Sequence, residues 1–129
     1  MIVLDTHALV WWVTDDPTLS KKAKAIIERE QAAGEIVVSS ISAWEIAMLV
    51  EHEKLVLSVD VSTWLAMAAE IARFVPVDVD VAVKSVQLPG KFHKDPADRM
   101  IVATARKFAA PLVTKDEKIR AYRHVKTIW

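Results

Sequence analysis

One segment, HKDPADRMIVATA from His93 to Ala105, carries the start signals of a helix with an acidic first turn. Asp95 offers the carboxylate of an N-cap, and Pro96 follows at the first helical position, where no amide hydrogen is needed. Apolar residues then recur every three to four positions, as in a helix with one buried face. Taken alone, Asp95 and Asp98 need be no more than helix-start acids, each stabilising the helix by about 1 kcal/mol.

The size and composition of the chain favour a single folded domain spanning residues 1–129. Hydrophobic residues make up 53% of the sequence, which excludes a disordered chain and allows a sizeable core. Seventeen basic and seventeen acidic side chains give zero formal net charge. Strong global attraction to nucleic acid is therefore excluded, and any such binding must use a local basic patch.

The sequence contains no cysteine, so disulfides and thiolate zinc sites are excluded. The four histidines share no metal-binding spacing: His7, His52, His93 and His124. No apolar run is long enough to span a membrane, and no signal peptide is recognisable at the N-terminus. A cytoplasmic protein without a membrane partner is expected.

Short apolar runs alternate with helical patterns along the whole chain. Strands are predicted at residues 1–4, 36–38, 74–77, 110–113 and 125–129. Helices are predicted at 8–13, 20–33, 42–50 and 61–74, from residue 96 onward, and at 117–122. Residues 79–86 are ambiguous, and a short helix is favoured over a strand. This order predicts an α/β fold, a three-layer α/β/α sandwich around a central, mostly parallel sheet.

Four acids follow strands or begin helices in this arrangement: Asp5, Glu45, Asp98 and Asp116. Each has a purely structural alternative. Asp5 can cap the next helix, Glu45 can close a capping box with Ser42, and residues 114–117 have the form of another box. Right-handed crossovers nevertheless bring strand carboxyl ends and helix N-termini to one edge, where ligands of such sheets bind.

Four clustered carboxylates repel one another unless a cation compensates for their charge. Oxygen ligands without cysteine suit Mg²⁺, for which Mn²⁺ can substitute, better than zinc. Magnesium held by carboxylates is suited to phosphate chemistry, because it polarises a phosphoryl oxygen and lowers the pKa of water.

Four motifs resemble the PIN-domain family, and most closely its VapC-type ribonuclease toxins from type II toxin–antitoxin pairs. They are DTH at 5–7, SSISAWEIA at 39–47, FHKDPADRMIVATA at 92–105 and LVTKDEKI at 112–119. The resemblance runs from Met1 to about Ile119. It implies a magnesium-dependent endoribonuclease that cleaves RNA phosphodiesters with a metal-activated water. It also implies a cognate antitoxin protein and a homodimer.

Carried over residue by residue, the family's catalytic and metal-binding acids fall on Asp5, Glu45, Asp98 and Asp116. Asp95 is interpreted as a helix cap outside that set. Thr114 is expected to orient the fourth acid or a bound water. Candidate contacts to RNA are Arg99, His93, Lys94 and Thr114, with Lys91 and Lys115 nearby. Arg99 is the strongest of these candidates because its neighbour is Asp98.

Five tryptophans are more than a core of this size needs, and one of the adjacent pair Trp11 and Trp12 is predicted to lie in an interface.

Three other functions remain open. A phosphatase with Asp5 as nucleophile is disfavoured, because His7 stands where a second aspartate is required. The others are a PIN nuclease of RNA maturation and a non-catalytic module that binds RNA or a partner.

Overall fold

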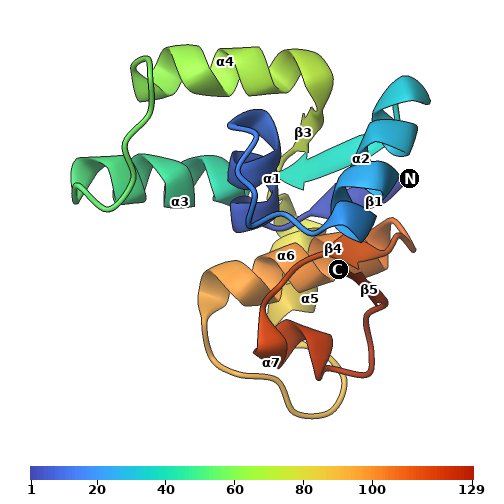
Figure 1. Cartoon of the computed structure of the whole chain (residues 1–129). Coiled ribbons are helices and arrows are strands. Elements are labelled where there is room, and N and C mark those ends of the chain that lie inside the picture. Colours follow the sequence, from blue (N-terminus) through green and yellow to red (C-terminus); the bar gives the residue numbers. More distant parts are fainter.

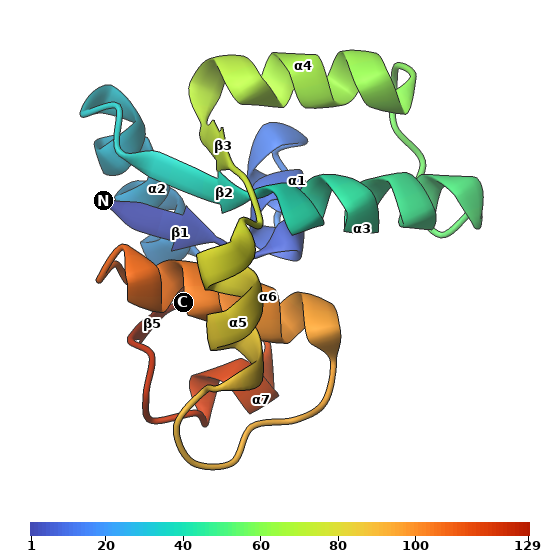
Figure 2. The same cartoon turned by 180° about the vertical axis from the view of Figure 1, so that it is seen from behind.

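A computed structural model describes all 129 residues of the chain. The strands are β1 (Ile2–Leu4), β2 (Ile36–Ser39), β3 (Arg73–Val75), β4 (Leu112–Val113) and β5 (Thr127–Ile128). The helices are α1 (Thr6–Val13), α2 (Lys21–Ala32), α3 (Ser40–Glu51), α4 (Val61–Ile71), α5 (Val79–Val86), α6 (Pro96–Lys107) and α7 (Glu117–Arg120). Figures 1 and 2 show their arrangement from opposite sides.

The strands form one five-stranded sheet in the order β3-β2-β1-β4-β5, and every pairing is parallel. The first strand lies in the middle, where Val3 pairs with Val37 on one side and Leu112 on the other. Parallel strands need crossover connections, and helices provide most of them here. The predicted α/β class and mostly parallel sheet are therefore confirmed.

Both faces of the sheet are buried. On one face, Ile2 and Leu4 pack with residues of α1, α2, α3 and α4, including Leu9, Ile27 and Trp64. On the other face, Val3 packs with residues of α5, α6 and α7, including Ile101. Successive side chains of a strand point to opposite faces, so the short run of β1 serves both cores. This is the predicted three-layer sandwich.

The helix after β2 begins differently from the prediction. Its N-cap is Ser39, whose side chain accepts from the backbone N–H of Ile41. Since α3 already begins at Ser40, Ser42 lies inside the first turn and cannot cap it. The capping box with Ser42, which was the structural alternative for Glu45, is therefore not formed, and the Glu45 side chain is available for another role.

Several other boundaries also differ. Helix α4 ends at Ile71, so that β3 begins at Arg73 and runs only to Val75. The last strand is two residues long. Residues 79–86 form a helix, as favoured, with Asp78 as its N-cap. No helix is both long and apolar enough to cross a bilayer.

Shortening a core side chain of α6 should lower the free energy of unfolding. Ile101 has no exposed surface, so Ile101→Ala should lower the free energy of unfolding by about 2–5 kcal/mol, through lost burial and the cavity left behind. Urea denaturation followed by circular dichroism measures it. The matched change Val83→Ala, at a side chain 47% exposed, should cost less than about 0.5 kcal/mol. Equal costs would contradict the assigned core.

Candidate active site

Three of the predicted acids follow strands of the parallel sheet, whose arrangement Figure 1 shows, and the carboxyl ends of these strands share one edge. Asp5 follows β1 directly, Glu45 lies in the second turn of α3 after β2, and Asp116 precedes α7 after β4. Asp98 lies in the first turn of α6. The charges of Asp5, Asp95, Asp116 and Glu45 all raise the pKa of Asp98. The four predicted acids are thus close enough to repel one another.

Asp5 is buried and fixed by hydrogen bonds to both carboxylate oxygens. Oδ1 accepts from the backbone N–H of Thr6 at 2.8 Å, which makes Asp5 the N-cap of α1. Oδ2 accepts from the Thr114 hydroxyl at 2.7 Å. The same hydroxyl accepts from the backbone N–H of Asp116 at 3.0 Å. Asp5 is therefore a helix cap as well as a member of the acid cluster, and Thr114 connects it to Asp116.

Glu45 is held by the hydroxyl of Thr6, which donates to its Oε1 at 2.6 Å. The Ser42 hydroxyl lies 2.8 Å from the same Thr6 oxygen. Burial raises the pKa of Glu45, the Thr6 hydrogen bond lowers it, and the charges of Asp5 and Asp95 raise it further. Thr6 and Ser42 thus position Glu45, a role that sequence reasoning missed although both residues stand in the quoted motifs.

Asp98 has the most perturbed carboxyl group in the site. Burial, followed by repulsion from the neighbouring carboxylates, raises its pKa to about 7. His93 Nε2 lies 3.0 Å from Asp98 Oδ2, without the alignment of a hydrogen bond and with no other partner. Asp95 accepts from the Asp98 backbone N–H at 3.1 Å and is the expected N-cap of α6.

A polar cleft of about 510 Å³ opens beside these acids, lined by His93, Asp95, Asp98, Asp116, Glu117 and Lys118. No lysine or arginine forms an ion pair with Asp5, Glu45, Asp98 or Asp116; only His7 and His93 approach two of them. Carboxylate oxygens with uncompensated charge suit a hard divalent cation. No three acidic or histidine side chains converge tightly enough to coordinate one ion together.

Arg99, a predicted contact to RNA, is not among the residues that line the cleft. Its guanidinium donates to the backbone oxygens of Ser85, Val86, Phe92 and His93. These bonds attach the loop before α6 to the end of α5. The same loop places His93 beside Asp98. We therefore assign Arg99 to positioning this loop, because four hydrogen bonds already engage its guanidinium.

The other candidate RNA contacts differ in exposure. Thr114 has no exposed surface, which argues against its expected contact with RNA, and its hydroxyl binds Asp5 and the Asp116 backbone N–H. The alternative capping box at 114–117 is not formed, because Asp116 itself caps α7 by accepting from Ile119 N–H. Lys94 is exposed, and His93 lines the cleft.

His7 lies between Asp5 and an aromatic group. Its Nε2 accepts from the Lys115 backbone N–H at 2.9 Å, so the proton of the neutral ring lies on Nδ1, 3.6 Å from Asp5 Oδ2. Burial lowers the pKa of His7, against the opposing charges of Asp5 and Asp116. Trp11 and Trp129 pack against the His7 ring.

Trp11 and Trp12 both pack on the core, and the predicted interface role of one of them stays a prediction.

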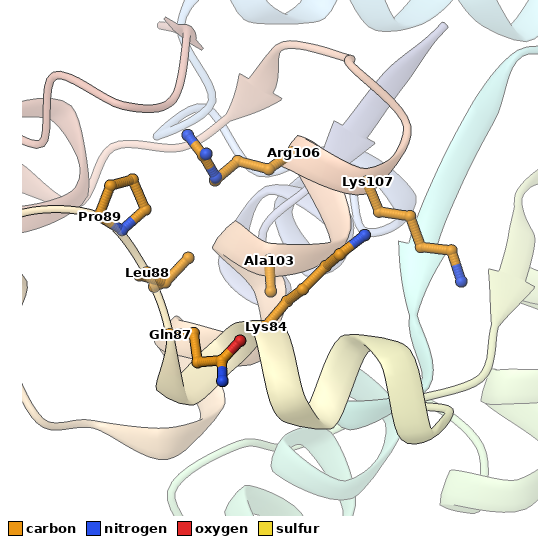
Figure 3. Close-up of a pocket in the computed structure, with 7 residues that line it drawn as sticks. All are labelled: Lys84, Gln87, Leu88, Pro89, Ala103, Arg106 and Lys107. Carbon is orange, nitrogen blue, oxygen red and sulfur yellow. The ribbon is translucent and has the colours of Figure 1, made fainter.

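A second cavity, of about 170 Å³, lies between α5, the following loop and α6 (Figure 3). Its cations come from Lys84, Arg106 and Lys107. Lys84 pairs with Asp80, and Lys107 pairs with Asp78 and Asp80. Arg106 and Lys107 lie in the last turn of α6, the opposite end from Asp98. Two of its three cations are thus paired with acids, and the cavity lies away from the four predicted site acids.

This fold and site can be compared with those of known proteins. The features compared are the strand order, the acids at the edge of the sheet and the helix that starts at Pro96. Residues 2–125 match the PIN domain family, and the chain belongs to it. Within that family, Ribonuclease VapC22 of Mycobacterium tuberculosis is 41% identical over 130 residues, which cover 99% of this chain and 98% of that protein.

Solved structures support the fold. VapBC2 from Rickettsia felis, bound to a DNA fragment from its promoter, superposes with a TM-score of 0.74 at 18% identity, covering 100% of this chain and 99% of that chain. FitAcB from Neisseria gonorrhoeae gives 0.70 at 21% identity, covering 100% and 97%. At these identities the likeness concerns the fold alone.

The charge of Asp98 predicts how stability depends on pH. Its pKa is raised from 3.8 to about 7 in the folded chain, so the folded state holds a proton that the unfolded state has lost. The free energy of unfolding should therefore fall as pH rises from about 4 to about 7 in EDTA. After solvent screening, Asp98 should contribute about 1–2 kcal/mol of this fall.

The contribution is measured as the difference between wild type and Asp98→Asn in urea denaturation at pH 5 and pH 8. Compared with wild type, the Asp98→Asn variant should be more stable at pH 8 than it is at pH 5. Asp80→Asn, which removes an exposed first-turn acid of α5, is the matched control. A difference that does not change with pH would contradict the assigned repulsion.

The contacts of Arg99 predict a loop that loosens in Arg99→Lys, because an ammonium group cannot reproduce the guanidinium fork. Trypsin should then cut faster after the exposed loop residues Lys91 and Lys94, as followed by mass spectrometry of limited digests. Arg123→Lys, at an exposed position, should leave the rate unchanged. An unchanged rate in Arg99→Lys would remove Arg99 from its positioning role.

Proposed function

We propose that this chain is a magnesium-dependent endoribonuclease that acts as the toxin of a toxin–antitoxin pair. The proposal is supported by the proximity of Asp5, Glu45, Asp98 and Asp116, whose charges influence one another without a lysine or arginine partner, beside an open polar cleft. The ribonuclease name of the relative at 41% identity supports RNA as substrate.

Magnesium, or manganese in its place, fits the donor set. Because no three side chains converge on one point, we infer that one or two carboxylates contact the ion directly and the others hold it through water, which is how proteins commonly bind Mg²⁺. Asp98 and Asp116, which line the cleft, are the candidate direct ligands. A bound Mg²⁺ polarises a phosphoryl oxygen and lowers the pKa of water.

The chain's own groups have distinct tasks in this proposal. Thr114 and Thr6 hold Asp5 and Glu45 in fixed positions through buried hydrogen bonds. The cleft receives the phosphodiester, and its acids orient a water for in-line attack on phosphorus. The bond to the 3′-oxygen breaks, which leaves a 5′-phosphate and a 3′-hydroxyl. His93 and Lys94 are the proposed contacts to RNA phosphate.

A cognate antitoxin and a homodimer complete the proposal. Structural neighbours are described as complexes of toxin with antitoxin, including one from Klebsiella pneumoniae with a TM-score of 0.69. An antitoxin would suppress the activity until it is released. The cytoplasm, where RNA and antitoxin would both be present, is the proposed location.

The proposal predicts cleavage of single-stranded RNA by the purified protein in Mg²⁺, and none in EDTA. Glu45→Gln keeps the Thr6 hydrogen bond but removes a charge, so cleavage should fall by more than about 100-fold. Gel analysis and sequencing of RNA ends measure the rate and the products.

The matched control is Glu28→Gln, at an exposed position of α2, which should cleave like wild type. Full activity of wild type in EDTA would contradict the metal. Full activity of Glu45→Gln would remove Glu45 from the site, and no cleavage by wild type in any divalent ion would favour a non-catalytic module.

A further inference from the structure

A cavity of about 360 Å³ lies between α3 and the start of α6, on the other side of Asp95 from the polar cleft. It is lined mainly by apolar side chains, with acids at its margin: Ile41, Trp44, Pro96, Met100, Glu45 and Asp95. Unlike the cavity of Figure 3, it contains no lysine or arginine. Its apolar walls therefore distinguish it from both other cavities described.

This cavity shares two acids with the acid cluster of the proposed active site. Glu45 is one of the four site acids and also lines the cavity. Asp95 lines both the cavity and the polar cleft, and it raises the pKa of Asp98 and of Glu45 by repulsion. Because the cleft and the cavity share Asp95, a nucleotide with its phosphate in the cleft can place its own base in the cavity.

The lining decides which part of a nucleotide can enter. A phosphate is excluded, because the walls are apolar and the only charged groups are carboxylates. A neutral base suits these walls, and Trp44, which is 54% exposed and has no aromatic partner, offers a ring for stacking. Asp95 uses Oδ1 to cap α6, so Oδ2 can accept a hydrogen bond from an amino or imino group of the base.

We propose that this cavity is a nucleobase subsite, in which Trp44 stacks on the base next to the scissile phosphate and Asp95 accepts from its edge. The proposal rests on the proposed ribonuclease function for its substrate. It adds a determinant of sequence preference, because the four bases carry their N–H donors at different positions and only some would present one to Asp95 while stacked on Trp44.

Binding and cleavage test the subsite separately. Fluorescently labelled RNA pentamers of A, C, G or U are compared with an abasic pentamer by anisotropy, with Ca²⁺ in place of Mg²⁺. Wild type should bind at least one homopentamer about tenfold more tightly than the abasic one. Trp44→Ala should lose that difference, whereas Trp44→Phe should keep most of it. The affinity for the abasic pentamer should stay the same in all three proteins.

A matched methionine pair gives the control. Met100→Ala, in the cavity wall, should reduce the base-dependent difference, and Met67→Ala, on α4 and 52% exposed, should not. In cleavage assays, Trp44→Ala should lower kcat/KM about tenfold and alter the base preference next to the cut.

Three results would overturn the subsite: no base dependence in wild type, an equal loss for base-containing and abasic RNA, or base dependence that persists in Trp44→Ala. If Trp44→Ala instead changes only the mass measured by light scattering, the cavity is an interface between copies. The binding arm decides these outcomes even if no RNA is cleaved, so failure of the proposed function is recognised separately.

Discussion

Repulsion between carboxylates is the interaction that the rest of this structure must counteract. The sheet brings the acids together because the ends of β1, β2 and β4 share one edge, and the buried valines and isoleucines of those strands stabilise the sheet. Asp5 is then held by a backbone N–H and a threonine hydroxyl, and Glu45 by a second threonine. The fold thus maintains a charged site that is unfavourable by itself and favourable towards a cation.

Much of this arrangement could be predicted from the sequence, because its signals are local. The short apolar runs predicted the strands, and Asp95 with Pro96 predicted the start of α6. The start of α3 was harder, because Ser39, Ser40 and Ser42 are all eligible caps. The paired part of β2 runs through Ser39, and the helix begins at once. That tertiary constraint overrode the capping-box pattern.

The roles of polar residues between the acids could not be predicted, since they depend on contacts between distant segments. Thr114 reaches Asp5 across 109 positions, and Thr6 reaches Glu45 across 39. Arg99 appeared suited to RNA because it follows Asp98, but successive residues of a helix point in different directions. Its side chain reaches carbonyl groups left free at the end of α5 and in the following loop.

The central position of β1 has a consequence for synthesis on the ribosome. Residue 3 pairs with residue 112 as well as with residue 37, so the first strand waits for nearly the whole chain before its second neighbour emerges. Asp5 likewise meets Thr114 only then. A nascent or prematurely terminated chain therefore lacks an assembled acid cluster. Completion of the acid cluster is therefore delayed until the end of translation by the order of the strands.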